Sequence, residues 1–502
     1  MNAASQTDTV FDVLIVGAGI SGIGMAAHLR DKCPGKSFAI VERRLALGGT
    51  WDLFRYPGVR SDSDMFTLGY EFEPWREARA IAPGDTILAY LGKVADDRDI
   101  RRHIRFGQKV RTADWDSAAG LWTLRCADDA GQASAVSGRF LFLGSGYYDY
   151  DDPHDAQIPG LDAFAGAVVH PQFWPEDLDV SGKRVVVVGS GATAVTLVPA
   201  LTTSAAHVTM LQRTPTWFAT RPSRDRLANL LNRLLPAKIA YALNRLKHIR
   251  LAELLISRAR SHPEGVKKFL HRQLAQQLGH DYNRADFSPP YNPWEQRLCL
   301  VPDGDFFRAL KAGTASIVTG QIAAVDAAGI RLADGRQIGA DIVVTATGLK
   351  LAVAGKIAIR LDGTPVNLAD RFYYRNAMFS NVPNFAALFG YLNASWTLRV
   401  DIVADWLCRL FNHMDKWGVD VATPYLAAEH GLIEHGAFDY FSSGYIARAS
   451  HLIPKSSTSP PWQISMDYRS DRHDLRHTPI DDGVLRFERA GVDALCPPPT
   501  FA

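Results

Sequence analysis

The chain has 502 residues, of which 47% are hydrophobic and 22% are charged, and its formal net charge at pH 7 is +2. This composition is typical of a globular protein with a full core, and the length suggests about three domains. The nearly neutral balance gives no overall electrostatic reason to expect a nucleic-acid partner.

The positions of the cysteines and the lengths of the apolar runs argue against several further classes of protein. The five cysteines form no C-x-x-C pair and no metal-ligand spacing, which disfavours a disulfide framework or a metal site. The first ten residues lack a basic region followed by an apolar run, and no apolar run reaches the ~18 residues of a spanning helix. We therefore expect no secretory signal, no membrane span and a reduced, cytoplasmic location.

The N-terminal region carries a dinucleotide fingerprint. A β-branched run (11–16), a helix-compatible stretch (23–29) and a second strand-like run (37–41) occupy about thirty residues. The tight turn between the first two contains Gly17, Gly19, Ser21 and Gly22. Glycines let the backbone approach a pyrophosphate, and Glu42 is placed to bind ribose hydroxyls. This pattern suits the adenosine ribose of FAD; the alternative is a structural turn without a ligand.

A long irregular block follows, Gly48-Gly-Thr50-Trp51-Asp52-Leu-Phe-Arg55-Tyr-Pro-Gly58-Val-Arg-Ser-Asp62. The periodicity of a helix or a strand cannot produce such a string. Further along, the chain reads Phe164-Ala-Gly166-Ala-Val-Val-His170-Pro-Gln-Phe-Trp174, or F-x-G-x-x-x-H-x-x-x-W. This connector lies between the first fingerprint and a second one.

The second fingerprint follows the strand-like run 184–188 and precedes another strand at 207–212. Its turn contains Gly189, Ser190, Gly191, Ala192, Thr193 and Ala194. Arg213 ends the second strand, where the first fold has Glu42. A carboxylate would repel a 2′-phosphate, whereas a guanidinium binds it through charge-assisted hydrogen bonds. We predict NADPH binding, assisted by Thr214; the alternative is that Arg213 is a solvated strand-end residue.

Residues 224–278 have leucines at helical spacing and many cations, which predicts a basic amphipathic region. The cations are Arg226, Arg233, Lys238, Arg245, Lys247, Arg250, Arg258, Arg260, Lys267, Lys268 and Arg272. Such a region could contact an anionic membrane surface. We favour the other interpretation, a helical subdomain that packs its leucines onto the second nucleotide fold.

Two strand-like runs end in glycine turns, at Gly144-Ser-Gly146 and at Ala346-Thr347-Gly348, one after each fingerprint. Together with the connector and the block from Gly48 to Asp62, they resemble the type I Baeyer-Villiger monooxygenases of the flavin-containing monooxygenase superfamily. Segments near 55–64, 292–304 and 393–396 are most similar to the ethionamide-activating branch.

The resemblance implies an α/β fold with two Rossmann-like dinucleotide-binding domains, for FAD and NADPH, and a helical insertion. We expect residues 1–150 to form the first part of the FAD domain. Residues 151–382 would form the NADPH domain, with the insertion at about 224–290. Residues 383–502 would complete the FAD domain and supply substrate-pocket loops.

The resemblance also assigns roles to residues. Thr50, Trp51 and Asp52 would line the flavin, with Val110 and Trp396 as further cofactor contacts. Arg297 would stabilise the negative oxygen that forms during catalysis, assisted by Asp62. Gln296 departs from the family pattern, in which a lysine is common. Phe164, Gly166, His170 and Trp174 would form a hinge without acid or base roles.

The implied reaction inserts one oxygen atom of O2 beside a ketone carbonyl, through a C4a-peroxyflavin, to give an ester or lactone. Oxidation of sulfur compounds is a second expected activity. Two alternatives stay open: an N- or S-oxygenase, and a non-oxygenating flavoprotein that acts in redox sensing or membrane docking. The expected partners are O2 and a ketone or sulfur-containing small molecule, with no nucleic acid.

Overall fold

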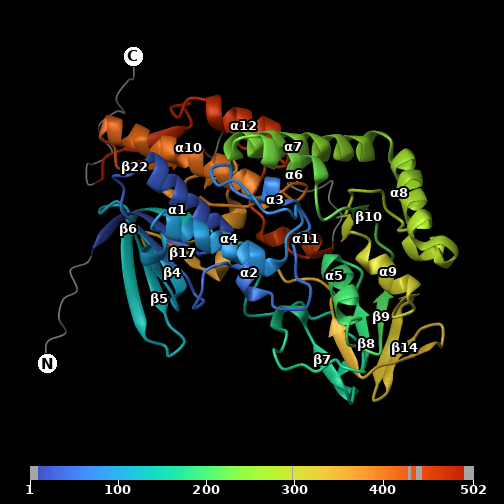
Figure 1. The fold of residues 1–502 in the computed structure, drawn as a ribbon. Helices are drawn as coiled ribbons and strands as arrows, with labels where there is room; N and C mark the ends of the chain where they lie inside the picture. Colours follow the sequence, from blue (N-terminus) through green and yellow to red (C-terminus); the bar gives the residue numbers. More distant parts are fainter. Residues whose placement is uncertain (1–8, 297, 428–430, 437–443, 491–502) are drawn as a thin grey trace.

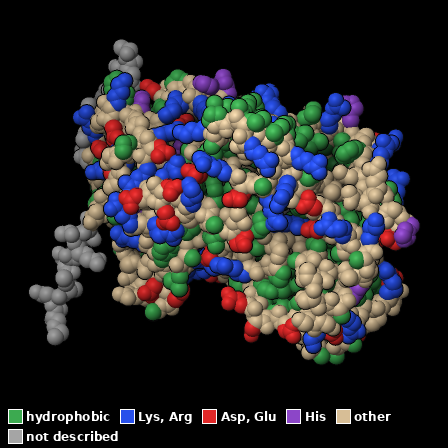
Figure 2. Space-filling view, in the orientation of Figure 1, with side chains coloured by type: hydrophobic (Ala, Val, Ile, Leu, Met, Phe, Trp, Pro, Cys, Tyr) green, Lys and Arg blue, Asp and Glu red, His purple; other side chains and the backbone are tan. Residues whose placement is uncertain are grey.

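The computed structural model describes residues 9–296, 298–427, 431–436 and 444–490. Two β-sheets lie side by side, and a layer of long helices crosses above both (Figure 1). The first sheet contains β4, β5 and β6, and the second contains β7, β8 and β9. The surface is hollowed between these two sheets, as the lower side of Figure 2 shows.

The first sheet has the order β18-β17-β4-β5-β6-β1-β2-β3, with β19–β21 attached at β6. Strands β6, β1, β2 and β3 are parallel, β5 runs antiparallel to both β4 and β6, and β4 runs parallel to β17. Its strands are β1 (Val10–Val16), β2 (Phe38–Val41), β3 (Ile104–Arg105), β4 (Lys109–Asp116), β5 (Leu121–Ala127), β6 (Ala133–Leu143), β17 (Ala358–Leu361), β18 (Thr364–Val366), β19 (Tyr373–Tyr374), β20 (Met378–Phe379) and β21 (Phe385–Ala387). The apolar run 13–16 is buried at its centre, as expected of a strand covered on both faces.

The second sheet has the order β12-β9-β8-β16-β7 and is entirely parallel. Its strands are β7 (Ala167–Val169), β8 (Arg184–Val188), β9 (His207–Gln212), β12 (Ala315–Thr319) and β16 (Ile342–Thr345). Smaller sheets pair β10 (Phe218–Arg221) with β11 (Cys299–Pro302), β22 (Val421–Pro424) with β23 (Leu485–Glu488), and β13 (Ile322–Asp326) with β14 (Gly329–Leu332) and β15 (Gln337–Gly339). The mixed first sheet and the parallel second sheet, with their helices, form the α/β fold that the sequence predicts.

The helices are α1 (Ile20–Lys32), α2 (Thr50–Leu53), α3 (Met65–Leu68), α4 (Gly84–Asp97), α5 (Ala192–Leu201), α6 (Arg226–Leu234), α7 (Ala237–Ser261), α8 (Pro263–Leu278), α9 (Asp305–Lys311), α10 (Trp396–Trp417), α11 (Gly444–Arg448) and α12 (Tyr468–His477). The chain leaves the second sheet after β16 and re-enters the first at β17. We propose that the first domain resumes there rather than at residue 383.

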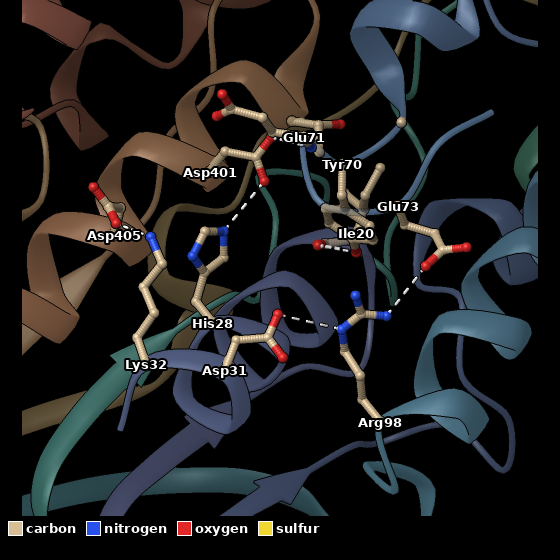
Figure 3. Close-up of polar contacts among 12 residues, drawn as sticks. Ile20, His28, Asp31, Lys32, Tyr70, Glu71, Glu73, Arg98, Asp401 and Asp405 are labelled. Carbon is tan, nitrogen blue, oxygen red and sulfur yellow. Dashed lines mark hydrogen bonds and ion pairs between the residues drawn. The ribbon is translucent and has the colours of Figure 1, made fainter. Parts of the chain in front are cut away.

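A charge cluster around the buried Asp401 joins α1 and α10 in the first fold. Asp401 on α10 accepts hydrogen bonds from His28 Nε2 on α1 at 3.3 Å and from the backbone N–H of Glu71 at 2.8 Å (Figure 3). Nearby, Lys32 of α1 pairs with Asp405 of α10, and Arg98 lies between Asp31 and Glu73. A buried carboxylate needs such partners, because water cannot solvate it.

The favoured interpretation of the helical insertion is wrong for α6 and α7. Helix α7 packs on the first fold: Arg245 donates to Asp401 Oδ2 at 2.8 Å, and Tyr241 donates to the carbonyl of Tyr70 at 3.0 Å. Most of its leucines are exposed. Only α8 meets the expectation, since Leu274 and Leu278 belong to the core of the second fold. The buried hydrogen bonds of Arg245 and Tyr241, rather than contacts of leucines, hold α7 in its position.

Candidate functional site

A cavity of about 2010 Å³ lies at the carboxyl ends of β1, β2 and β6 in the first sheet and against the start of α5 in the second fold. Ligands of open α/β sheets bind at this edge. The cavity is larger than the ~300–1,000 Å³ typical of a single small-molecule pocket. It therefore has room for more than one ligand.

The first glycine turn forms one wall. Gly17 has φ of +98°, and a Cβ at this position would lie 2.7 Å from the carbonyl oxygen of Gly144. A Cβ on Gly22 would lie 1.8 Å from the carbonyl oxygen of Gly17. Gly19 and Ser21 line the cavity itself. The outer glycines are thus required for packing, and the middle of the turn faces the space where a ligand would lie.

Glu42 lines the same wall and has only 4% of its surface exposed. Its Oε2 accepts from the backbone N–H of Ala18 at 2.7 Å, and its Oε1 accepts from that of Arg44 at 2.8 Å. Burial raises the pKa of Glu42 above its usual value. A carboxylate has about four acceptor sites, so each oxygen retains one for a ribose hydroxyl.

The block from Gly48 to Asp62 covers this wall, and its side chains point in two directions. Thr50, Trp51 and Asp62 line the cavity. The side chain of Asp52 turns instead to Arg44, whose Nε donates at 2.5 Å, and to Arg55. Asp52 is therefore placed to hold the block in shape, behind the residues that face the cavity.

Aromatic residues form a second wall that the sequence did not predict in full. Tyr147 stacks on Trp396 with ring centroids 5.0 Å apart, and its hydroxyl lies 2.6 Å from that of Tyr148. Trp396 donates to Ser21 Oγ at 2.8 Å, and Val110 of β4 also lines the cavity. The position of Tyr147, directly after the glycine turn that ends β6, is the signal that could have found it.

The second glycine turn repeats the first in backbone form. Gly189 has φ of +133°, and a Cβ there would lie 2.2 Å from the carbonyl oxygen of Ala346. A Cβ on Gly191 would meet no atom within 4 Å. Ser190 Oγ donates to the carbonyl of Thr214 at 3.1 Å. The middle of this turn therefore faces open space.

Other residues of the second fold take separate positions. Ala192 and Thr193 reach the large cavity, whereas Ala194 is buried under the turn. Arg213 is exposed just beyond β9 and does not line the cavity. Only the start of α5 therefore connects this turn with the shared space.

The residues of the connector lie away from the cavity. Phe164 is buried, and a Cβ on Gly166 would lie 2.2 Å from the carbonyl oxygen of Asp341. His170 Nδ1 accepts from the backbone N–H of Gln172 at 3.2 Å, and burial lowers the pKa of this histidine. Trp174 packs against the core of the second fold. The connector is thus built into the edge of the second sheet through β7.

Arg297 lies outside the described residues. Its neighbours Trp294, Leu298 and Leu300 line the cavity. The described residues on both sides of position 297 therefore line the same cavity as Asp62.

A polar cluster that sequence reasoning missed forms the far side of the cavity. His248 of α7 contacts Asp64 Oδ2 through Nδ1 at 3.1 Å and Asp225 Oδ2 through Nε2 at 3.0 Å. Burial would raise the pKa of Asp64, but hydrogen bonds and charges from His248 and Arg221 outweigh it and lower that pKa. No local signal predicts the cluster, because its members are far apart in the chain.

Comparison with known proteins places these features in a family. Residues 78–352 match the flavin-binding monooxygenase-like family, and residues 15–76 match an NAD(P)-binding Rossmann-like domain. The chain is 47% identical over 480 residues to the FAD-containing monooxygenase EthA of Mycobacterium tuberculosis, covering 95% of this chain and 98% of that protein. It is 45% identical over 479 residues to the probable FAD-binding monooxygenase AlmA of Acinetobacter baylyi, covering 95% and 96%.

Solved structures share the fold. An oxidised steroid monooxygenase bound to NADP superimposes with a TM-score of 0.75 at 23% identity, covering 96% of this chain and all of that one. OTEMO in complex with FAD and NADP superimposes with a TM-score of 0.74 at 21% identity, covering 95% and 99%.

Proposed function

Because the chain belongs to the flavin-binding monooxygenase-like family, we propose that it is a Baeyer-Villiger monooxygenase that uses FAD and NADPH. It would insert one oxygen atom of O2 beside a ketone carbonyl and give an ester or a lactone. One observation carries this proposal: the first glycine turn and the start of α5, directly after the second turn, line a single cavity through Gly19 and Thr193. Two nucleotides bound at these turns would meet in one chamber.

The residues present fit FAD at the first turn. The adenosine ribose would bind Glu42, and the pyrophosphate would lie against Gly19 at the N-terminus of α1. Trp51, Tyr147 and Trp396 would enclose the ring system with apolar surface. When bound, FAD accepts a hydride from NADPH and activates O2, which is chemistry that no side chain supplies.

The second turn fits NADPH. Its pyrophosphate would lie at Gly191, where no atom obstructs a ligand. Arg213 would bind the 2′-phosphate as a permanent cation, with Thr214 beside it. The start of α5 would direct the nicotinamide end into the cavity through Thr193.

The proposed catalytic residues are Arg297 and Asp62. The guanidinium of Arg297 would hold the negative charge that develops on the substrate oxygen, and it cannot lose its proton at working pH. Asp62 lines the cavity and would orient that guanidinium through an ion pair. We expect sulfur compounds to be oxidised in the same space.

The decisive experiment incubates the purified flavoprotein with NADPH, ¹⁸O₂, a panel of linear, cyclic and aryl ketones, and a sulfide. One labelled oxygen in an ester or lactone supports the proposal. Labelled sulfoxide alone would indicate a heteroatom oxygenase, and hydrogen peroxide alone a non-oxygenating flavoprotein.

The variant Arg297→Ala tests the role of the guanidinium. We expect ketone turnover to fall by at least about 100-fold, as for the loss of one stabilising donor, with unchanged flavin content. Arg111→Ala, at an exposed position on β4, serves as the control. Equal ketone turnover in both variants would contradict the assignment.

A further inference from the structure

Helices α6 and α7 expose an unusual amount of apolar surface. The large apolar side chains exposed there and outside the large cavity are Leu227, Leu230, Leu234, Ile239, Leu243, Leu246 and Leu254, whereas the exposed Leu251, Leu255 and Phe269 line that cavity. Leu234 is 70% exposed and Ile239 is 52% exposed. Isolated leucines on a surface need no explanation, but seven large apolar side chains on two consecutive helices mark an interaction surface. We call this set the apolar helical face.

The spacing concentrates these side chains along the helices. Leu227, Leu230 and Leu234 follow each other at three and four residues on α6, so they share one side of that helix. Ile239, Leu243 and Leu246 do the same on α7. Figure 2 shows hydrophobic side chains beside Lys and Arg along the upper edge, where Figure 1 places α7 and α8.

The apolar helical face is strongly basic. Residues 226–278 contain eleven Lys and Arg but only two acids, Glu253 and Glu264. The segment therefore has a formal charge of +9, and the rest of the chain has −7. Among the described residues, several of these cations lie outside the large cavity and have no hydrogen-bond or ion-pair partner for their side chains: Arg226, Arg233, Lys238, Arg250 and Arg272.

Four arginines also gather at the edge of α6. A surface hollow of about 730 Å³ is lined by Arg79, Arg224, Arg226 and Arg233, with Asp303 as the one acid among its lining residues. Leu230 lines the same hollow. Cationic donors for a phosphate therefore adjoin the exposed leucines.

These features distinguish between the possible occupants. A second copy of the chain in a two-fold contact would bring the unpaired cations of one face against those of the other, which repel. Lys and Arg interleaved with large aliphatic side chains are instead the pattern of helices that lie in a membrane interface. No helix within the described ranges has the length and apolar content to cross a bilayer, so the contact would be with the membrane surface.

We propose that the apolar helical face docks the protein onto an anionic lipid bilayer. The leucines enter the boundary between headgroups and acyl chains, and the unpaired arginines bind lipid phosphates at the level of the hollow. This inference does not depend on the proposed oxygenation, since docking requires neither turnover nor a particular substrate.

The test is sedimentation of the FAD-loaded protein with vesicles of phosphatidylcholine, with and without phosphatidylglycerol. We expect binding to the anionic vesicles that weakens as salt is raised. The variant Arg226→Gln/Arg233→Gln should bind about fivefold more weakly for each charge removed. The variant Leu230→Glu/Leu234→Glu/Leu243→Glu should lose sedimentation altogether, since it places charge where apolar contact is needed.

Leu45→Glu is the matched control, because Leu45 is 82% exposed on the first fold and lies outside the face. Flavin content and circular dichroism verify that each variant is folded, since none of the exchanged side chains lines the large cavity. Equal vesicle binding by the triple leucine variant and the control would overturn the proposal. A wild-type dimer that the triple variant converts to a monomer would also overturn it, because a second copy would then cover the face.

Discussion

In the first fold, Gly19 lies against Gly49 and Glu42 is almost completely buried, whereas in the second fold Gly191 faces open space and Arg213 is exposed. The backbone turns are nevertheless alike, since Gly17 and Gly189 both have positive φ, and a Cβ on either would meet the backbone just past the neighbouring strand, β6 or β16. The glycine fingerprint therefore determines the conformation of the turn, but not whether other residues cover it. The first turn is enclosed by the block 48–62, through Gly49, and by α10, through Trp396.

Exchanging a glycine in each fold should give the largest contrast. Gly22→Ala places a Cβ 1.8 Å from a backbone oxygen, so the turn must shift; we expect loss of most bound flavin and a stability decrease of about 1–3 kcal/mol. Gly191→Ala has no atom within 4 Å and ordinary φ of −78°, so fold and flavin should persist. Flavin absorbance per protein and thermal unfolding measure both. Equal flavin loss in the two variants would refute the contrast.

The exposed site should depend on a single charge. Arg213→Gln removes the proposed partner of the 2′-phosphate, and hydrogen bonds to charged groups contribute about 1.5–3 kcal/mol. We expect the KM for NADPH to rise about 10- to 100-fold, with the KM for NADH unchanged. Arg184→Gln is the control, because Arg184 lies at the opposite end of the same sheet and pairs with Asp341. An equal rise for both nucleotides would argue against a phosphate contact.

An ion pair directly links the two folds. Arg60 lies in the block 48–62 of the first fold and pairs with Asp305 at the start of α9 in the second. Both side chains are partly buried, so a double-mutant cycle with Arg60→Met and Asp305→Asn should give a coupling energy of about 1 kcal/mol. Urea unfolding of the four proteins measures it. Strict additivity would mean that the two folds do not communicate through this pair.

The smallest expected effect concerns the acid limb of stability. Burial opposes ionisation of Asp225, but Lys247, the N–H of Ala228 and His248 outweigh it and lower the pKa of Asp225 to about 2. Because the folded pKa lies below the unfolded value of about 3.9, its contribution is present above pH ~4 and is lost as pH falls through ~2. Asp225→Asn should flatten this acid limb in thermal unfolding.

Asp225→Ala separates charge from capping. Asp225 Oδ1 also accepts from the N–H of Ala228 at the start of α6, at 2.9 Å. The alanine variant loses that cap and about 1 kcal/mol at every pH, whereas asparagine can keep it. If Asp225→Asn retains the acid slope of the wild type, another carboxylate is responsible.

Local patterns made much of the nucleotide sites predictable. Gly17 and Gly189 end buried strands and begin helices, and Glu42 follows at a fixed offset, so a short window contains the whole signal. The glycine turns after β6 and β16 were recognised for the same reason. Each of these features depends on residues that are close to each other in the sequence.

Features built from distant residues could not be predicted. The stacking of Tyr147 on Trp396 joins positions about 250 residues apart, and sequence spacing does not show that Asp52 turns toward Arg44. The same holds for α7, whose leucines suggested a packing face. Its position follows from the buried pairing of Arg245 with Asp401, which hydrophobic periodicity does not reveal.

Helix α7 has 25 residues and so extends about 37 Å at 1.5 Å per residue. Arg245 fixes its first half to the first fold, and its last residues are separated from α8 by His262 alone. Helix α8 is in turn embedded in the second fold through Leu278. The two helices therefore connect the two folds through a linker of a single residue. Leu251 and Leu255 of α7 form part of the cavity wall, so a rotation of one fold against the other would change the width of the cavity.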